Sequence, residues 1–306
     1  MKLFRAKSRQ YEMIGVEFTD EGVALAHIER VAGQPPRLVH AEFIPCEAGV
    51  AVARLREKLS SLNLKARQVT VLMPREGYQL LLGEAPKVPA EQRNEALRWK
   101  VKDLVSFPVA DAVIDSFLLN ESCSRGGVPM AYVTVAPRKD VAQVVADVKD
   151  AGLEMVAIDI PELALARLVD NSMDTTRPVA LVHLVAGGGT LVMVKSGELY
   201  LARNFKLDYN GGLLDDIPTE PLMLELQRSL DYFERQLRQA PASQILLCGE
   251  NVSADKISED LQAGMGGRIG LLDLIAVVSK SPDIEEHVQS LCMRALGAAL
   301  REEAVS

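Results

Sequence analysis

The sequence has 306 residues, 48% of them hydrophobic, so the chain can bury a full core and its length favours two domains. Its formal net charge of -8 argues against a nucleic-acid-binding protein, because such proteins need clustered Lys and Arg. The four cysteines lie far apart without a CxxC pair, which predicts reduced thiols and neither a zinc site nor a redox dithiol. No apolar run is long enough for a secretory signal or a membrane span, so we expect a cytoplasmic protein.

Residues 1–10 form a basic terminus in which Lys2, Arg5, Lys7 and Arg9 alternate with apolar and small side chains. Such a segment favours an anionic membrane surface by roughly 1 kcal/mol per basic residue. A solvated, flexible terminus is the simpler interpretation, because chain ends are usually loosely held.

Residues 11–176 alternate between strand and helix patterns, which is typical of an α/β lobe. The segment 12–26 predicts a β-hairpin, because two runs rich in Val and Ile flank a polar turn. The other elements predicted for this lobe are strands at 37–44, 68–73 and 155–160 and helices at 55–62 and 162–168.

Residues 77–153 predict a small α+β subdomain inserted into this first lobe. Pro89 and the acidic residue that follows it indicate a helix start, and Gly126-Gly127 indicates a hairpin tip. Gly152 marks the end of a helix whose valines recur at helical spacing. The predicted elements are strands at 78–82, 112–119 and 129–136 and helices at 96–101 and 141–148.

Residues 177–306 predict a second lobe that opens with a meander like the one at the start of the chain. The architecture therefore looks duplicated, although no sequence repeat proves it. The predicted elements are strands at 179–185, 190–194, 199–205 and 245–248, a long amphipathic helix at 223–237 and a closing helix at 288–300.

If the protein binds a nucleotide, we expect the binding residues in the turns of the two meanders. Actin-like ATPases grip a triphosphate with such turns: backbone N–H groups bind phosphate, and an Asp in each lobe orients the metal ion and water. In the first turn Glu17 replaces the usual Asp, and Thr19, followed by Asp20, replaces the usual glycine. A side chain at that glycine position obstructs close approach to phosphate.

The second turn departs from the same pattern. His183 stands where an Asp is expected and Val185 where a glycine is expected, and His is a poor ligand for magnesium. The triplet Gly187-Gly188-Gly189 before Thr190 can form an anion nest, but such glycines also occur in hairpins for steric reasons. Gly249 is a single glycine where nucleotide-binding relatives carry two or three. The sequence thus predicts a degenerate nucleotide site, with neither a catalytic residue nor a metal ligand.

Several segments, taken in order, resemble the PilM family of type IV pilus biogenesis proteins, most closely its MshI members from mannose-sensitive haemagglutinin (MSHA) pilus systems. Their order and spacing carry the resemblance, which runs from about Met13 to Gly249. The segments are IGVE at 14–17, EALRWK at 95–100 before Phe107-Pro108, VAPR at 135–138, AGL at 151–153, VAIDI at 156–160 and LQRSLDYF at 226–233.

The resemblance implies an actin-like fold related to the cell-division protein FtsA, with the insertion at about 77–153. It also implies a role at the inner membrane, where PilM-like proteins bind the short cytoplasmic tail of a PilN-like (here MshJ-type) membrane protein. That tail lies in a groove between the first lobe and the insertion, and the assembly is coupled indirectly to a cytoplasmic assembly ATPase. ATP binding is a feature of PilM itself, and the substitutions at Glu17, Thr19, His183 and Val185 argue against ATP and magnesium as cofactors here.

Peptide capture needs an apolar groove and a few backbone partners, so it can persist without a nucleotide site. We expect the strand at 78–82 and the helix at 96–101 to line this groove, with core packing as the alternative role for each residue. The expected groove residues are Tyr78, Leu80, Leu82, Leu97, Trp99 and Val101.

Three functions follow from these patterns. The first is an adaptor that couples an inner-membrane pilus subassembly to the cytoplasmic motor. The second is an actin-like ATPase whose nucleotide state gates that coupling. The third, a sugar or acetate kinase of the same superfamily, ranks lowest because the acidic pair of the phosphate turns is missing.

Overall fold

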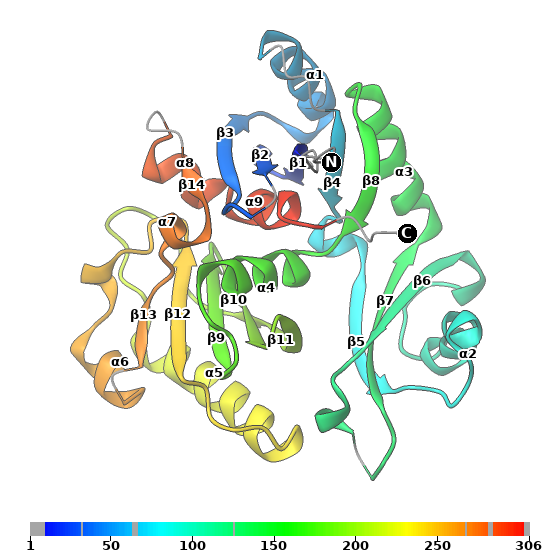
Figure 1. Cartoon of the computed structure of the whole chain (residues 1–306), viewed down its shortest axis with the longest axis vertical. Helices are drawn as coiled ribbons and strands as arrows, with labels where there is room; N and C mark the ends of the chain where they lie inside the picture. Colours follow the sequence, from blue (N-terminus) through cyan, green and yellow to red (C-terminus); the bar gives the residue numbers. More distant parts are fainter. Residues whose placement is uncertain are drawn as a thin grey trace, which may run out of the picture.

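The computed structural model describes residues 10–31, 33–62, 67–124, 126–266, 268–280 and 284–302. The predicted basic terminus falls on residues that lie almost entirely outside these ranges. Two large β-sheets lie on either side of a pair of helices, and a small third sheet stands beside them (Figure 1).

The two large sheets share one topology. The first has the order β14-β3-β2-β1-β4-β8 and the second the order β11-β10-β9-β12-β13, so each combines an antiparallel meander with parallel strands. The duplicated architecture expected from the sequence is therefore confirmed at the level of strand order. The strands of the first sheet are β1 (Gln10–Thr19), β2 (Gly22–Val31), β3 (Arg37–Pro45), β4 (Gln68–Leu72), β8 (Glu154–Asp159) and β14 (Ser279–Lys280). Those of the second are β9 (Val179–Val185), β10 (Gly188–Lys195), β11 (Glu198–Lys206), β12 (Gln244–Gly249) and β13 (Ile269–Leu271).

Helices α4 (Pro161–Ser172) and α9 (Met293–Ala299) pack together between the two sheets (Figure 1). α9 lies on β1 and α4 on β10, so the central core joins both lobes. Glycine permits α9 to approach both β1 and α4 closely. A Cβ on Gly15 of β1 would collide with the carbonyl of Ala295 in α9, and a Cβ on Gly297 of α9 would collide with the carbonyl of Ala164 in α4.

The outer faces of the two sheets are covered by other helices. In β1 Met13 faces α9 while Ile14 faces the opposite side, as the period of two along a strand requires. That opposite side of the first sheet is covered by α1 (Ala51–Ser61) and α3 (Arg138–Asp150). The second sheet is covered by α5 (Thr219–Asp231), which continues into a π-helical turn (Tyr232–Gln236).

The predicted division between lobes near residue 177 can be compared with the packing of α4 and of the last elements of the chain. α4 precedes that point but packs on the second sheet, because its apolar face meets β9, β10 and β11. The end of the chain returns to the first sheet, where β14 pairs with β3 and α9 covers β1. Each lobe therefore contains segments from both sides of residue 177.

The inserted subdomain is built around the third sheet, whose order is β5-β7-β6. Its elements are β5 (Gln79–Glu84), α2 (Ala90–Val101), β6 (Ala112–Leu118) and β7 (Met130–Pro137). α3 was predicted inside it, but Val144 and Val148 pack into the core of the first lobe. The hairpin tip at Gly126-Gly127 is confirmed, since both residues have positive φ.

The insertion also touches the second lobe. Tyr132 of β7 is buried in the core of that lobe, and its hydroxyl oxygen accepts a hydrogen bond of 2.8 Å from the backbone N–H of Ala202. The side chain of Gln239 donates to the Ser122 carbonyl at 3.3 Å. The insertion therefore bridges the two lobes along one side of the molecule.

The last third of the chain holds elements that the sequence patterns left unassigned. The predicted closing helix is two helices, α8 (Glu286–Leu291) and α9, with a break at Cys292. The unassigned helices are α6 (Glu259–Gly264) and α7 (Leu274–Val277). Short 3-10 turns occur at Ala48–Val50, Arg75–Gly77, Val109–Asp111, Glu121–Cys123 and Ala254–Lys256. In the described ranges, no helix has both the length and the apolar character that crossing a bilayer requires.

Candidate functional site

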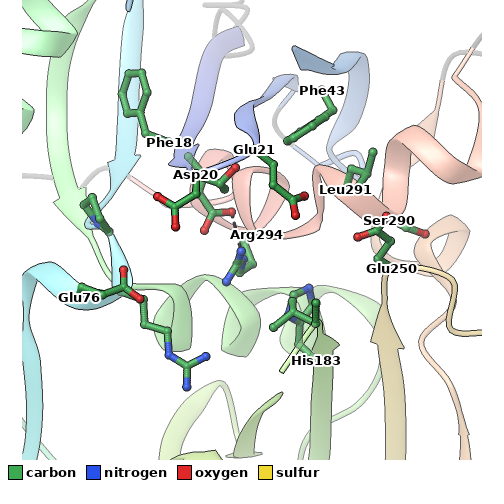
Figure 2. Close-up of a pocket in the computed structure, with 16 residues that line it drawn as sticks. Phe18, Asp20, Glu21, Phe43, Glu76, His183, Glu250, Ser290, Leu291 and Arg294 are labelled. Atoms are coloured by element: carbon green, nitrogen blue, oxygen red, sulfur yellow. Dashed lines mark hydrogen bonds and ion pairs between the residues drawn. The ribbon is translucent and has the colours of Figure 1, made fainter. Parts of the chain in front are cut away.

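A cavity of about 320 Å³ lies between the two lobes, where the β1–β2 turn faces the end of β9 (Figure 2). Three of the residues that the sequence predicts for a degenerate nucleotide site line it: Glu17, Thr19 and Asp20. His183 and Val185 line the opposite wall.

The carboxylate of Glu17 forms an ion pair with a cationic side chain of the same chain, Arg294. Arg294, from α9, donates a hydrogen bond of 3.0 Å from Nε to the Glu17 carboxylate, and Glu17 is only 6% exposed. Burial raises the pKa of the Glu17 carboxyl, and the charge of Arg294 opposes that shift. Figure 2 shows the guanidinium between the hairpin turn and His183. The protein itself therefore supplies the positive charge that faces this carboxylate.

His183 is buried and uncharged near neutral pH. Burial, followed by the nearby charges of Arg294 and Arg75, lowers the pKa of its imidazole well below 6.5. A neutral imidazole beside two guanidiniums is not a ligand set for magnesium, which prefers carboxylate and phosphate oxygens. In the described part of the chain, no three His, Cys, Asp or Glu side chains are grouped as a metal site.

The glycine turn of the second lobe is used for strand packing. The N–H of Gly187 donates to the Tyr209 carbonyl at 2.8 Å, so it does not point at a ligand. A Cβ on Gly188 would collide with the Phe205 carbonyl, and one on Gly189 would come within 2.6 Å of the Phe205 ring. The steric explanation for these glycines is thus supported by their contacts.

Three other predicted nucleotide contacts also bond or pack within the protein. Thr190 donates its hydroxyl to the Asn204 side chain at 2.6 Å, and Thr19 donates to the Gly22 carbonyl at 3.1 Å. Gly249 lies directly against the Leu184 carbonyl of the neighbouring strand. Most of the predicted nucleotide contacts therefore bond or pack within the protein, while Asp20 lies exposed at the cavity.

The six residues expected to line a peptide groove do not share one surface. Leu97 and Val101 are buried in the core of the insertion, on the α2 side of its sheet. Leu80 and Leu82 face the other side, toward the second lobe. The two remaining residues differ in exposure: Trp99 is 67% exposed on α2, whereas Tyr78 is buried.

Tyr78 belongs to a buried polar chain that joins the lobes. Its hydroxyl donates to Glu162 at 2.6 Å, and the other oxygen of Glu162 accepts a bond of 3.0 Å from the Asn204 amide. Asn204 in turn accepts the hydrogen bond from Thr190. Tyr78 therefore acts as a link between the start of the insertion, α4 and the second sheet.

A second cavity, of about 490 Å³, lies between the insertion and the first lobe. Its walls come from the last residues of β6, from the end of β8, from α4 and from β11. Among the described residues, β6 and β8 are each the outermost strand of their sheet, so each has a paired strand on one side only. The apolar side chains of this groove are Phe117, Leu118, Ile158, Ile160, Leu163 and Leu199.

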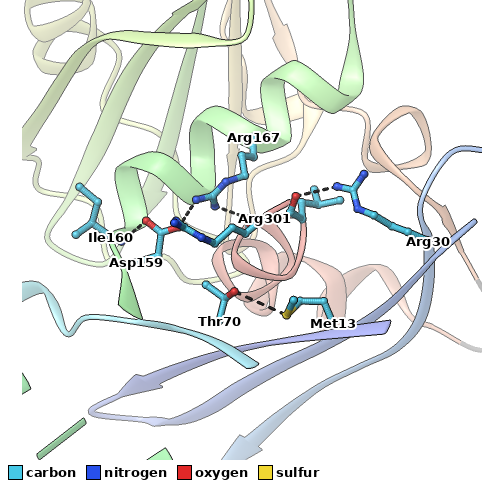
Figure 3. Close-up of polar contacts among 9 residues, drawn as sticks. Met13, Arg30, Thr70, Asp159, Ile160, Arg167 and Arg301 are labelled. Carbon is cyan, nitrogen blue, oxygen red and sulfur yellow. Dashed lines mark hydrogen bonds and ion pairs between the residues drawn. The ribbon is translucent and has the colours of Figure 1, made fainter. Parts of the chain in front are cut away.

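One buried carboxylate organises the floor of this groove (Figure 3). Asp159, at the end of β8, is 4% exposed and accepts hydrogen bonds from Arg167 of α4 and from Arg301, the latter at 2.9 Å. Its other oxygen accepts from the Ile160 N–H at 2.8 Å. Two guanidiniums share one carboxylate here, and two further carboxylates, Asp115 and Glu198, line the same cavity.

Neither protein-family models nor curated protein sequences match the chain. Among solved structures, a similar chain belongs to the PilM-PilN type IV pilus biogenesis complex, with a TM-score of 0.73 and 20% identity over 95% of this chain and 98% of that one. The fold is PilM-like and actin-like.

A second similar structure is the cytoplasmic domain of EpsL, an inner membrane component of the type II secretion system of Vibrio cholerae. It has a TM-score of 0.52 and 12% identity, and the match covers 96% of this chain and 97% of that domain. Both likenesses establish the fold, which is the one that the sequence resemblance implied.

Sequence reasoning missed the residues that form the groove. Asp159 was noted only as part of a family segment, and Arg301 lies near the end of the chain, far from any motif. One signal was present: an Asp that ends an apolar parallel strand stands at the edge where ligands of α/β sheets commonly bind. Arg294 gave no comparable signal, because its partner Glu17 is 277 residues away.

Proposed function

We propose that this protein is a non-catalytic adaptor that holds an extended segment of a partner in the groove between β6 and β8. The partner class is the cytoplasmic tail of a PilN-like (MshJ-type) inner-membrane protein of an MSHA-type pilus assembly machine. On this proposal the protein works in the cytoplasm, bound to the inner membrane through that partner.

The observation that carries this proposal is that β6 and β8, each the outer strand of its sheet among the described residues, line one cavity. An extended peptide can hydrogen-bond to such an edge through its backbone, while its alternate side chains enter neighbouring pockets. Most apolar groove side chains are only partly buried, and Leu118 is 45% exposed. The groove thus offers both backbone partners and apolar surface for a strand-like ligand.

Two further observations support the adaptor over the ATPase. In the cavity between the lobes, Glu17 is paired with Arg294. The backbone N–H of Gly187, in the glycine turn, already donates to the Tyr209 carbonyl. The PilM chain of similar fold was solved as a complex with PilN, which makes a PilN-like tail the natural first ligand to test.

The test is a fluorescence anisotropy titration with a labelled peptide that spans the cytoplasmic tail of the host's PilN-like protein. Leu118→Asp places a charge in the groove at an exposed position, so the fold should persist, and we expect the affinity to fall at least about tenfold. Trp99→Asp is the matched control, because Trp99 is more exposed and lies outside the groove. Equal affinity for wild type and Leu118→Asp would rule out this groove.

A further inference from the structure

A third cavity, of about 400 Å³, lies at the far end of the second lobe. Pro178 and Ser243, which immediately precede β9 and β12, line it. Those strands run parallel, and their opposite ends, at His183 and Cys248, point toward the cavity between the lobes. The third cavity and the cavity between the lobes therefore lie at opposite ends of the same sheet.

Three cationic side chains converge on this third cavity: Arg177, Lys195 and Arg268. No Asp or Glu lines it, and within the described ranges none of the three cations is paired with a carboxylate. This is unusual in a chain whose net charge is -8, where acidic side chains outnumber basic ones. Like charges gathered without a counter-charge repel one another, and a bound anion relieves that repulsion.

Neutral groups hold two of the cations in place. Arg268 donates to the Ala242 carbonyl at 2.8 Å and to the Met265 carbonyl at 3.2 Å. Lys195 donates to the Gln239 side chain at 3.2 Å, and its ammonium lies 5.7 Å from the centre of the Tyr200 ring. These bonds orient the side chains without neutralising them.

The hydroxyl groups at this cavity are already used. Ser243 donates to the Pro178 carbonyl at 3.0 Å, and Thr176 donates to Asp174 at 3.0 Å. Asp174 is the acidic residue nearest to Arg177 in the sequence, yet its carboxylate caps the Thr176 N–H and does not pair with Arg177. Among the described side chains that line the cavity, the donors left for a ligand are therefore those N–H groups of Arg177, Lys195 and Arg268 that are not used in the bonds above.

We propose that this cavity is a binding site for a phosphate group, held by Arg177, Lys195 and Arg268. Guanidinium groups bind phosphate oxygens through paired N–H donors, and an ammonium adds a point charge. The phosphate can be a free anion or the headgroup of an anionic phospholipid. The site is separate from the proposed peptide groove, with which it shares no lining residue.

The first arm of the test follows thermal unfolding of the full chain against inorganic phosphate at constant ionic strength. A ligand that binds only the folded state stabilises it by RT ln(1 + [L]/Kd), so Tm rises with the logarithm of the phosphate concentration once that exceeds Kd. For the wild-type protein we expect such a rise. The test variant is the double substitution Arg177→Gln/Arg268→Gln, which changes two solvent-exposed side chains. In this variant we expect the apparent phosphate affinity to fall at least about tenfold.

The matched control is Arg54→Gln/Arg235→Gln, since both are exposed arginines outside the cavity and their loss removes two charges, as in the test variant. We expect it to respond to phosphate as the wild type does. A Tm rise that is identical in all three proteins, or no rise of the wild-type Tm with phosphate, would overturn the proposal.

The second arm separates the two sources of phosphate by sedimentation with vesicles of phosphatidylglycerol mixed with phosphatidylcholine. If the site takes a lipid headgroup, the wild type sediments with these vesicles and the double variant does not. If it takes free phosphate, neither protein sediments while the first arm still distinguishes them. Equal sedimentation of both proteins, with no difference in the first arm, contradicts a site at these residues.

Discussion

The Nε atom of Arg294 lies 3.0 Å from a carboxylate oxygen of Glu17, although 277 residues separate the two in the chain. The pair joins the last helix to the first strand in the cavity where actin-like proteins hold nucleotide. Glu17 stands where the sequence predicts the metal-orienting Asp, so a magnesium ion would compete with Arg294 for this carboxylate. The proposed loss of nucleotide function therefore has a specific structural basis.

Titration calorimetry with ATP and magnesium tests this point. We expect no saturable heat for the wild type, because the Gly187 N–H is bound to Tyr209 and Glu17 is bound to Arg294. Arg294→Ala is the matched variant, and it should also fail to bind, since the glycine turn stays closed. Micromolar binding by the wild type would contradict this account of the cavity.

The buried His183 predicts a loss of stability in acid. Its pKa is lowered well below 6.5, so the unfolded chain takes up a proton below about pH 6.5 that the folded chain does not. The free energy of unfolding should therefore decrease as the pH falls through this value, by up to about 1.4 kcal/mol per pH unit for one group. Urea denaturation at several pH values measures this slope.

His183→Gln is the test variant for that slope, because glutamine cannot take up the proton. The variant should lose stability more slowly than the wild type between about pH 6.5 and pH 5.5. Burial also lowers the pKa of His27, which contributes equally to both proteins. Glu17, whose pKa is raised, acts in the opposite sense, because its contribution falls as the pH rises above about 4.5. Equal slopes in both proteins would show that His183 is not the group responsible.

The hydrogen bond from Tyr78 to Glu162 predicts a coupled effect on stability. Tyr78→Phe removes the donor to a carboxylate that is 1% exposed, so we expect a loss of about 1.5–3 kcal/mol in the free energy of unfolding. A double-mutant cycle with Glu162→Gln isolates the pair, because each single change disrupts the same bond. A coupling energy near zero would mean that the two side chains do not interact in solution.

The sequence predicted most elements whose pattern is local. The hairpin of β1 and β2, the paired strands of the insertion and the helix ended by Gly152 all follow from apolar periodicity and turn residues. The duplicated sheet could be inferred because each lobe begins with a similar meander.

What the sequence could not show depends on long-range packing. The return of α9 to the first sheet has no local signal, because a buried apolar helix can cover either sheet equally well. The expected groove also failed to assemble as one surface, since Leu80 and Leu97 lie on opposite faces of the insertion's sheet. The groove between β6 and β8 exists only because two distant strand edges meet.

The central claim is that a partner segment lies along those two edges, and amide hydrogen exchange followed by mass spectrometry tests it most directly. Adding the PilN-like tail peptide should slow exchange in residues 112–118 and 154–160 and leave α2 unchanged, because only the first two segments line the groove. Protection confined to α2 or to the turn at residues 19–22, with none in β6 or β8, would contradict the claim.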